Sequence, residues 1–304
     1  MSISTKKIAI ILATLNGEQW IVAQLLSIKS QQHENWHVFL RDDGSSDQTI
    51  AIAKALLHPT YLTVLSAADG PTGSPAGNFF AALSQVQLEN FDYISFCDQD
   101  DIWAPDKLSR AINCLIKSGA AAYSCDLIAF DNTRNTAWYL KKSQIKSSFD
   151  YLFQGASAGC TYVLTQSAAS LVKKKTLPLL GAFPKARSHD WLIYAICRSY
   201  SLDWYMDHSA HIFYRQHATN AFGGLPGITG LLDRWRLARS GWYREHVLWL
   251  RQFLNDSLDE RAILDQVERR GWRSRLALIR NCRSFRRNAS DARKLALAIA
   301  LGIF

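Results

Sequence analysis

The chain has 304 residues and a formal net charge of +9, and its 48% hydrophobic and 20% charged content suits one large domain with an appendage. The apolar run at residues 8–15 is only as long as a strand and lacks a small-residue cleavage site, which excludes a signal peptide. No segment approaches the roughly 20 apolar residues of a membrane-spanning helix.

Up to about residue 130, short β-rich runs alternate with amphipathic helical runs. The expected strands are residues 8–13, 37–41, 62–65, 93–97 and 121–130. A first helix is expected over residues 21–28 with Asn16 as its cap, a second follows Asp47, and a third begins at Pro105. This alternation favours a mostly parallel sheet covered by helices on both faces. Residues 131–230 have a less regular pattern.

Two of the expected strands end in acidic residues. The second stops in residues 41–47 (RDDGSSD) and the fourth in residues 98–103 (DQDDIW). Ligands of open α/β sheets bind outside the carboxyl ends of the strands, so these ends form the candidate site. Crowded carboxylates repel one another unless a cation lies between them, and a diphosphate bridged by Mg²⁺ or Mn²⁺ is a natural partner for such a cluster.

A purely structural interpretation exists for each acidic motif. Asp42, Asp43 and Asp47 are also typical of turn and cap residues before a helix. The acids at 98–101 also suit a solvated loop, although three acids directly after a strand that is expected to be buried argue against that interpretation.

Together with residues 13–17 (ATLNG), the two acidic motifs resemble the family 2 glycosyltransferases of GT-A fold, and the resemblance covers roughly residues 6–222. It implies an α/β fold, a Rossmann-like mixed sheet flanked by helices, and a nucleoside-diphosphate-sugar donor. The donor-binding residues implied are Thr14, Asn16, Asp43, Asn78, Asp98 and Asp100. Asp43 would contact the nucleobase. Leu15 stands where the family usually has tyrosine, which removes an aromatic ring that could stack on the base.

The same resemblance assigns the metal. Asp98 and Asp100 would touch the donor ribose and a divalent cation, with Asp101 beside them. The implied cofactor is Mg²⁺ or Mn²⁺, since both prefer oxygen ligands.

Residues 153–160 (FQGASAGC) and 188–191 (SHDW) resemble the acceptor half of the bacterial rhamnosyltransferase-like branch. This resemblance implies that Asp190 is the general base, with His189 and Trp191 beside it. A single base without a second catalytic carboxylate implies direct displacement with inversion, the diphosphate leaving under metal stabilisation. The alternative is that Asp190 only caps the apolar helix that follows it.

The motif YRQH at residues 214–217 closes the family-like region. Arg215 or His217 could reach the donor diphosphate or the metal. A histidine near a turn is more often structural, so that interpretation stays open for His217.

The rhamnosyltransferase-like pattern makes dTDP-L-rhamnose the first expected donor and a UDP-hexose the second. A saccharide or lipid-linked acceptor in cell-surface polysaccharide synthesis follows by analogy alone. A sugar nucleotidyltransferase would also use an α/β sheet and metal-binding acids. It would be expected to carry a glycine-rich, basic phosphate loop near the N-terminus, which this sequence lacks.

The excess positive charge lies in the C-terminal part of the chain. Residues 234–294 contain 15 arginines and one lysine against seven acids, an excess that equals the net charge of the whole chain. We therefore expect a catalytic domain over residues 1–230, with a nucleotide-sugar half (1–130) and an acceptor half (131–230). A basic helical region follows over residues 231–304.

Three tryptophans of this tail, Trp235, Trp242 and Trp249, are spaced by seven and fall on one helical face. Aromatic rings beside arginines suit the headgroup layer of an anionic membrane. Packing of the same stripe on the catalytic domain is the alternative. An arginine-rich, aromatic tail also describes a nucleic-acid-binding protein, but the acidic strand ends would repel phosphate backbones and no nucleic-acid motif is present.

The six cysteines show no C-x-x-C spacing, and several lie in apolar runs. They are expected to be reduced, which implies a cytoplasmic location, and peripheral association with the inner face of the cytoplasmic membrane is a further expectation.

Overall fold

A computed structural model of the protein describes residues 3–184, 187–217 and 239–304. The chain divides into two compact units. Unit 1 comprises residues 1–143, 157–190 and 202–217, and unit 2 comprises residues 144–156, 191–201 and 218–304. The division falls inside helix α6 (His189–Ser199), between Asp190 and Trp191. The domain boundary expected at residue 230, and with it Trp235, lies outside the described residues.

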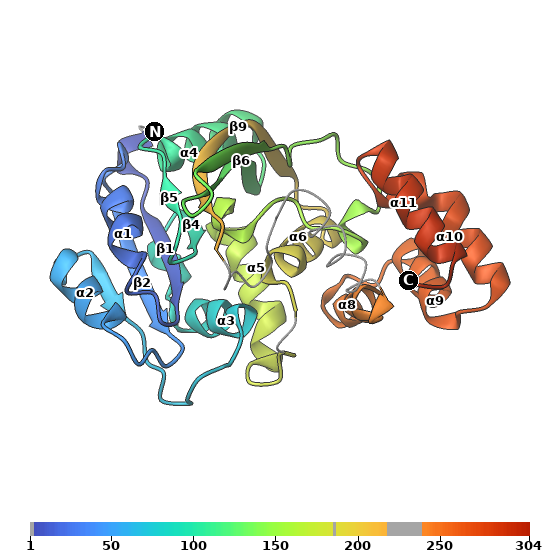
Figure 1. Ribbon diagram of the computed structural model, residues 1–304, viewed down its shortest axis with the longest axis horizontal. Helices are drawn as coiled ribbons and strands as arrows, with labels where there is room; N and C mark the ends of the chain where they lie inside the picture. The colour runs from blue at the N-terminus through green and yellow to red at the C-terminus, as the bar shows by residue number, and fades with distance from the viewer. Residues whose placement is uncertain (1–2, 185–186, 218–238) are drawn as a thin grey trace. The chain divides into compact units, whose positions relative to one another are not determined.

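Unit 1 is built on one mixed sheet, to which the described residues contribute nine strands (Figure 1). The order is β3-β2-β1-β4-β8-β6-β9-β5, with β7 paired to β6. The strands are β1 (Ile8–Thr14), β2 (Trp36–Asp42), β3 (Leu62–Val64), β4 (Tyr93–Cys97), β5 (Ile102–Trp103), β6 (Ala122–Asp131), β7 (Thr136–Leu140), β8 (Val163–Thr165) and β9 (Trp204–Arg215). The five strands expected from the sequence are confirmed, as is the mixed α/β fold class.

The central strand β1 is buried along its whole length, which explains its unbroken apolar sequence. It pairs in parallel with β2 on one side and β4 on the other. Thr14 lies opposite Asp42, and Leu12 lies opposite Cys97. The carboxyl ends of the three strands therefore meet at one edge of the sheet, where both acidic motifs begin.

Helices of unit 1 cover this sheet (Figure 1). They are α1 (Ile21–Lys29), α2 (Thr49–Leu56), α3 (Pro75–Gln85), α4 (Lys107–Ser118) and α5 (Gln166–Thr176). Three of them, α1, α2 and α4, confirm the expected helices, whereas α3 was not expected. The expected cap of α1 was wrong, because Trp20 is the N-cap residue and Asn16 lies four residues earlier with a left-handed φ of 47°.

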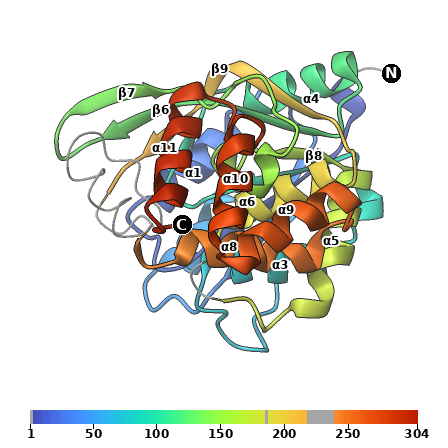
Figure 2. The same ribbon diagram turned by 90° about the vertical axis from the view of Figure 1, so that its right-hand side faces the viewer.

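Unit 2 contains the C-terminal helices, and its helical character is confirmed over residues 239–304 (Figure 2). They are α8 (Trp242–Leu250), α9 (Leu258–Arg269), α10 (Trp272–Phe285) and α11 (Ala289–Ala300). A capping box of Ser257 and Glu260 begins α9. Helices α10 and α11 run side by side and bury Leu278, Phe285 and Leu295.

Two sequence expectations concern the whole chain. None of the helices in the described ranges is long and apolar enough to cross a bilayer. The six cysteines all fall within the described ranges, where each is buried and none forms a disulfide.

Candidate active site

The turn after β2 is held by its own side chains. The Asp42 carboxylate accepts hydrogen bonds from the amides of Gly44 (3.1 Å) and Ser45 (2.7 Å) and from the Thr14 hydroxyl (2.8 Å). Asn16 connects this turn to the end of β1, because its amide donates to Ser45 Oγ (2.7 Å). Its side-chain oxygen also accepts a hydrogen bond from the amide of Ser46 (2.9 Å). Asp42 and Asn16 therefore fix the backbone where β1 and β2 end.

The carboxylate of Asp43 is buried and engaged by protein groups. Arg41 Nη1 forms an ion pair with it at 3.0 Å. The amides of Thr72 (2.7 Å) and Gly73 (2.8 Å) and the Thr72 hydroxyl (2.9 Å) donate to it as well. Asp43 thus joins the end of β2 to the loop that precedes α3.

Asn78, on α3, lies at the same junction and is 3% exposed. Its side-chain amide donates to the carbonyls of Thr14 and Arg41, both at 3.2 Å, and its oxygen accepts a hydrogen bond from Arg41 (2.9 Å). The structure therefore brings Thr14, Asn16, Asp43 and Asn78 together at the ends of β1 and β2.

The acidic loop after β4 is fastened to the loop after β1 by Gln99, which sequence reasoning missed. Gln99 accepts a hydrogen bond from the Leu15 amide and donates one to the Leu15 carbonyl, both at 2.9 Å. A side chain at Gly17 would overlap the carboxamide of Gln99, so Gln99 could keep this position only next to a glycine. The contact of Gln99 with Leu15 could be predicted from the DQDD motif only if β1 were known to lie beside β4.

Asp98 and Asp101 are carboxylates that the site does not neutralise. Burial and the neighbouring charges of Asp100 and Asp190 raise the pKa of Asp98 to about 8. Burial, Asp100 and Asp98 also raise the pKa of Asp101 well above its usual range. Asp101 Oδ1 accepts a hydrogen bond from the Arg215 amide (3.1 Å), whereas its buried Oδ2 has no hydrogen-bond partner among the described residues.

These carboxylates could hold a cation. Ligand atoms of Asp98, Asp101 and Cys160 lie within 4.8 Å of one another. A buried carboxylate oxygen without a donor is the group that a metal would satisfy, and oxygen ligands suit Mg²⁺ or Mn²⁺. Cys160 was not predicted as a neighbour of this cluster, since it lies far away in the sequence.

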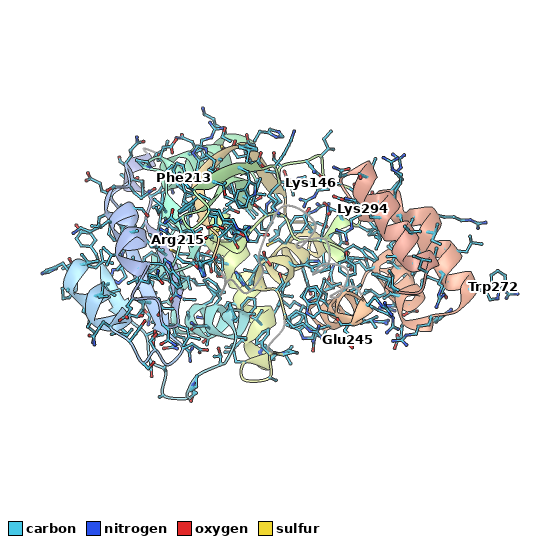
Figure 3. The ribbon with its side chains drawn as sticks, in the orientation of Figure 1. Lys146, Phe213, Arg215, Glu245, Trp272 and Lys294 are labelled. Atoms are coloured by element: carbon cyan, nitrogen blue, oxygen red, sulfur yellow. The ribbon has the colours of Figure 1, made fainter. Side chains whose placement is uncertain are left out.

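Asp100 contacts His217. His217 Nε2 lies 2.8 Å from Asp100 Oδ2, and the imidazole stacks on Trp20 at a centroid distance of 4.2 Å. Arg215, labelled in Figure 3, lies at the end of β9 and donates from Nε to the Asp100 carbonyl (2.8 Å). Arg215 and His217 of the YRQH motif are thereby brought to the acidic loop. There the Asp100 carboxylate and the His217 imidazole offer metal-ligand atoms.

A buried lysine lies beneath the acidic loop and was also missed. Lys107 Nζ donates to Ser95 Oγ (2.6 Å) and lies 3.5 Å from the centroid of the Trp103 ring. Burial lowers the pKa of Lys107 to about 8. The tryptophan of the DQDDIW motif thus contacts a buried cation.

Asp190 lies in the first turn of α6 and accepts a hydrogen bond from the Ser188 hydroxyl. Its charge is among the causes that raise the pKa of Asp98, so the expected base is close to the acidic loop. His189 packs against Phe79 at 4.3 Å between ring centroids, and burial lowers its pKa. A side chain at Gly159 would overlap His189 Nε2.

Trp191 belongs to unit 2. It is 5% exposed, donates from Nε1 to the Tyr151 carbonyl (2.8 Å) and stacks on His246 at 4.3 Å. The structure therefore places Trp191 in an aromatic core, whereas Asp190 and His189 stay with the acidic loop in unit 1.

Comparisons with known sequences bear on the chemistry of this site. The profile of the family described as "Glycosyl transferase family 2" matches residues 9–174. The dTDP-rhamnosyl transferase RfbG of Shigella flexneri is 34% identical over 297 residues, which cover 96% of this chain and all of the relative. WfgD of Escherichia coli, a UDP-Glc:alpha-D-GlcNAc-diphosphoundecaprenol beta-1,3-glucosyltransferase, is 23% identical over 62% of this chain and 68% of its own.

Comparison with solved structures bears on the fold. Residues 1–349 of S. aureus TarS, crystallised with UDP-GlcNAc, superpose with a TM-score of 0.59. The match covers 86% of this chain and 70% of that chain at 17% sequence identity. A likeness at this identity shows a shared fold alone.

Proposed function

Because this chain belongs to glycosyl transferase family 2 and has the GT-A fold, we propose that it transfers L-rhamnose from dTDP-rhamnose to a hydroxyl of a saccharide or lipid-linked acceptor. The transfer inverts the anomeric carbon and contributes to a cell-surface polysaccharide. The observation that carries the proposal is the group of acids Asp98, Asp100 and Asp101 at one sheet edge, with Asp190 close to Asp98. The near full-length likeness to a dTDP-rhamnosyl transferase supports the donor sugar.

Asp190 acts as the general base in this proposal. The Ser188 hydroxyl donates a hydrogen bond to its carboxylate and orients it. A carboxylate near the anomeric carbon takes the proton of the acceptor hydroxyl as the new bond forms. One base permits direct displacement and therefore inversion.

A divalent cation would be held by Asp98, Asp100 and Asp101, with His217 beside them. The 2.8 Å approach of His217 to Asp100 and the unpartnered oxygen of Asp101 fit such a group. When bound, Mg²⁺ or Mn²⁺ supplies positive charge that stabilises the leaving diphosphate. Arg215 contributes a second positive charge at the same loop.

In this proposal Asp43 contacts the nucleobase. The contact requires a free lone pair on a carboxylate oxygen of Asp43. The Thr72 hydroxyl can release the carboxylate, because it also lies 3.1 Å from the Ser74 carbonyl and can donate there instead. The N3–H group of thymine or uracil would then take its place as donor. Thr14, Asn16 and Asn78 keep the strand ends in position around the donor.

The basic tail places the enzyme on the inner face of an anionic membrane in this proposal. The excess of arginine over residues 234–294 supports it. Two tryptophans of the stripe pack inside unit 2 instead, since Trp242 stacks on His246 (5.0 Å) and Trp249 contacts Phe253 (4.9 Å). Other exposed residues must therefore meet the membrane.

A donor panel tests the proposed reaction. The purified enzyme is incubated with dTDP-rhamnose, UDP-glucose or UDP-N-acetylglucosamine, and donor hydrolysis is measured with Mn²⁺, Mg²⁺ or excess chelator. We expect turnover of dTDP-rhamnose that requires the metal. Preference for a UDP-hexose would support the alternative donor, and undiminished turnover in chelator would contradict the metal assignment.

A further inference from the structure

A cavity of about 320 Å³ lies within the C-terminal part of unit 2, between α8, α9, α10 and the end of α11. Four arginines line it, namely Arg239, Arg244, Arg270 and Arg275. Glu245 is the only acid among the described residues that line it. The volume is at the lower end of the range for small-molecule sites, and the wall is strongly basic.

Three of these arginines carry charge that no carboxylate neutralises at ion-pair distance. Arg270 and Arg275 form no ion pair with any described residue. Arg244 donates to the backbone carbonyls of Val267 (3.0 Å) and Glu268 (2.8 Å), which fix its direction without cancelling its charge. Burial and the neighbouring charge of Arg270 lower the pKa of Arg244, as expected where like charges are held together.

The start of α8 adds to the positive potential. Ser240 and Gly241 line the cavity, and Gly241 is the N-cap residue of α8 without a side-chain cap. Backbone amides of a first helical turn point outward and favour an anion. The Trp242 amide already donates to Ser240 Oγ (3.3 Å) and Glu245 lies in the same turn, so the arginines supply most of the positive potential.

Three exposed apolar side chains of unit 2 lie close in sequence to residues that line the cavity. Leu276 follows Arg275 and is 40% exposed, and Leu301 precedes Gly302, which lines the cavity, and is 63% exposed. Trp272 is 70% exposed and projects away from the helices of unit 2 (Figure 3). Exposed apolar side chains around basic groups are typical of a surface that enters the headgroup layer of a bilayer.

We propose that this cavity binds the phosphate of an anionic lipid headgroup, while Trp272, Leu276 and Leu301 enter the surrounding bilayer. Guanidinium groups bind phosphate through two parallel hydrogen bonds, which suits arginines converging on one cavity. A soluble phosphate ester presents the same chemistry, so the experiment separates the two sources. The site is independent of the donor and base residues of unit 1.

The test compares two double variants of the full-length protein. Arg270→Gln/Arg275→Gln removes two cavity charges and disturbs no ion pair. Arg280→Gln/Arg283→Gln removes two exposed charges of α10 that do not line the cavity. Glycerol 3-phosphate binding is measured by calorimetry at constant ionic strength. Binding to phosphatidylglycerol vesicles in a phosphatidylcholine background is measured by sedimentation.

We expect saturable glycerol 3-phosphate binding by the parent and the α10 control, and its loss in the cavity variant. Loss of two basic charges alone weakens vesicle binding by up to roughly 25-fold. Vesicle binding by the cavity variant should be weaker than that by the control variant by a further factor of about 10, because a specific contact is lost as well. Donor hydrolysis should stay at the parent rate in both variants, which separates this site from the proposed reaction.

Two results would overturn the proposal. Equal vesicle binding by the two double variants, with glycerol 3-phosphate binding lost only in the cavity variant, would reject the lipid and assign the cavity to a soluble phosphate ester. Absence of saturable glycerol 3-phosphate binding by the parent would show that the cavity is no phosphate site.

Discussion

At the residue scale, the acids of the strand ends differ in what already contacts them. Asp42 is engaged by the turn it belongs to, and Asp47 accepts a hydrogen bond from the Thr49 amide (3.0 Å) at the start of α2. Asp98 and Asp101 have raised pKa values because they are buried beside other carboxylates. An acid that is already satisfied shapes the backbone, whereas an uncompensated acid calls for a cation.

Substitution of Asp190 should therefore affect the transfer rate, whereas substitution of Asp100 should affect donor and metal binding. Asp190→Asn keeps the shape of the side chain and removes the proton acceptor, so transfer should fall by roughly 100-fold or more with little change in donor affinity. Asp100→Ala should weaken donor and metal binding first. Donor affinity by calorimetry and transfer rate, measured on both variants, separate the two roles. Near-parental transfer by Asp190→Asn would show that the base lies elsewhere.

The raised pKa of Asp98 predicts that the metal-free enzyme loses stability as pH rises. The carboxyl has an ordinary pKa near 4 when unfolded and about 8 when folded, so the folded state holds the proton between these values. Its contribution is fully present below about pH 4 and is lost as pH rises through about 8, with a slope of at most about 1.4 kcal/mol per pH unit. Urea unfolding in chelator measures this slope.

Two variants and the addition of Mn²⁺ test whether Asp98 causes the decrease in stability with pH. Asp98→Asn should reduce the slope by up to about 1.4 kcal/mol per pH unit while Asp101 still contributes, whereas Asp259→Asn, an exposed acid of α9, should leave it unchanged. Mn²⁺ added at pH 8 should restore stability, because the cation compensates the charge that the proton no longer does. An unchanged slope in Asp98→Asn would mean that another group titrates.

At the element scale, the parallel half of the sheet could be predicted because strand and helix periods alternate clearly up to residue 130. Helix α3 was missed because its start is signalled only by Ser74 and Pro75. Ser74 Oγ accepts a hydrogen bond from the Gly77 amide (3.1 Å), and proline occupies the first helical position. The cap of α1 was wrong because Asn16 bonds across the sheet edge to Ser46 instead.

The candidate site was predictable only in its local part. Acids that directly follow a strand can be found from the sequence, because the end of that strand lies at the edge of the sheet. Contacts between distant segments, such as Gln99 with Leu15 or Asp100 with His217, depend on strand order, which a single sequence does not supply.

The first turn of α6 depends on Gly159, which has no side chain to displace His189. Gly159→Ala should push His189 and the adjoining Asp190 away, lowering the transfer rate more than donor affinity. His189→Ala in the same protein removes the overlapping ring, so the double variant should be destabilised by less than the sum of the two single changes. A double-mutant cycle by urea unfolding measures this coupling. Strict additivity would contradict the predicted contact.

At the scale of the whole molecule, a buried ionic network inside unit 2 joins residues 239–304 to the segments 144–156 and 191–201 of the same unit. Asp150 is fully buried and pairs with Arg198 (3.1 Å) and Arg287 (3.5 Å), while the Tyr194 hydroxyl donates to it (2.9 Å). Arg287 also donates to the carbonyls of Gly155 (2.6 Å) and Ala156 (3.2 Å). Part of the basic charge of the tail is therefore structural and faces inward.

Arg287 should consequently matter more for stability than an exposed arginine nearby. Arg287→Leu leaves Asp150 with one cationic partner and removes the donor that Arg287 gives to the carbonyls of Gly155 and Ala156, so the free energy of unfolding should fall by about 3 kcal/mol. Arg283→Leu, at an exposed position of α10, should change it by less than about 0.5 kcal/mol. Urea unfolding of both variants provides the comparison, and equal values would show that the network contributes little.

Removal of the tail therefore tests folding before it tests membrane binding. A protein that ends before residue 239 loses Arg287 and also Glu260, which accepts a hydrogen bond from the Tyr151 hydroxyl (2.8 Å). It would also expose the aromatic face of Trp191, which stacks on His246. We expect the truncated protein to melt at a lower temperature and to bind a dye for exposed apolar surface, even without vesicles. A truncated protein that melts as the parent does, and only loses vesicle binding, would show that the tail is a separable membrane module.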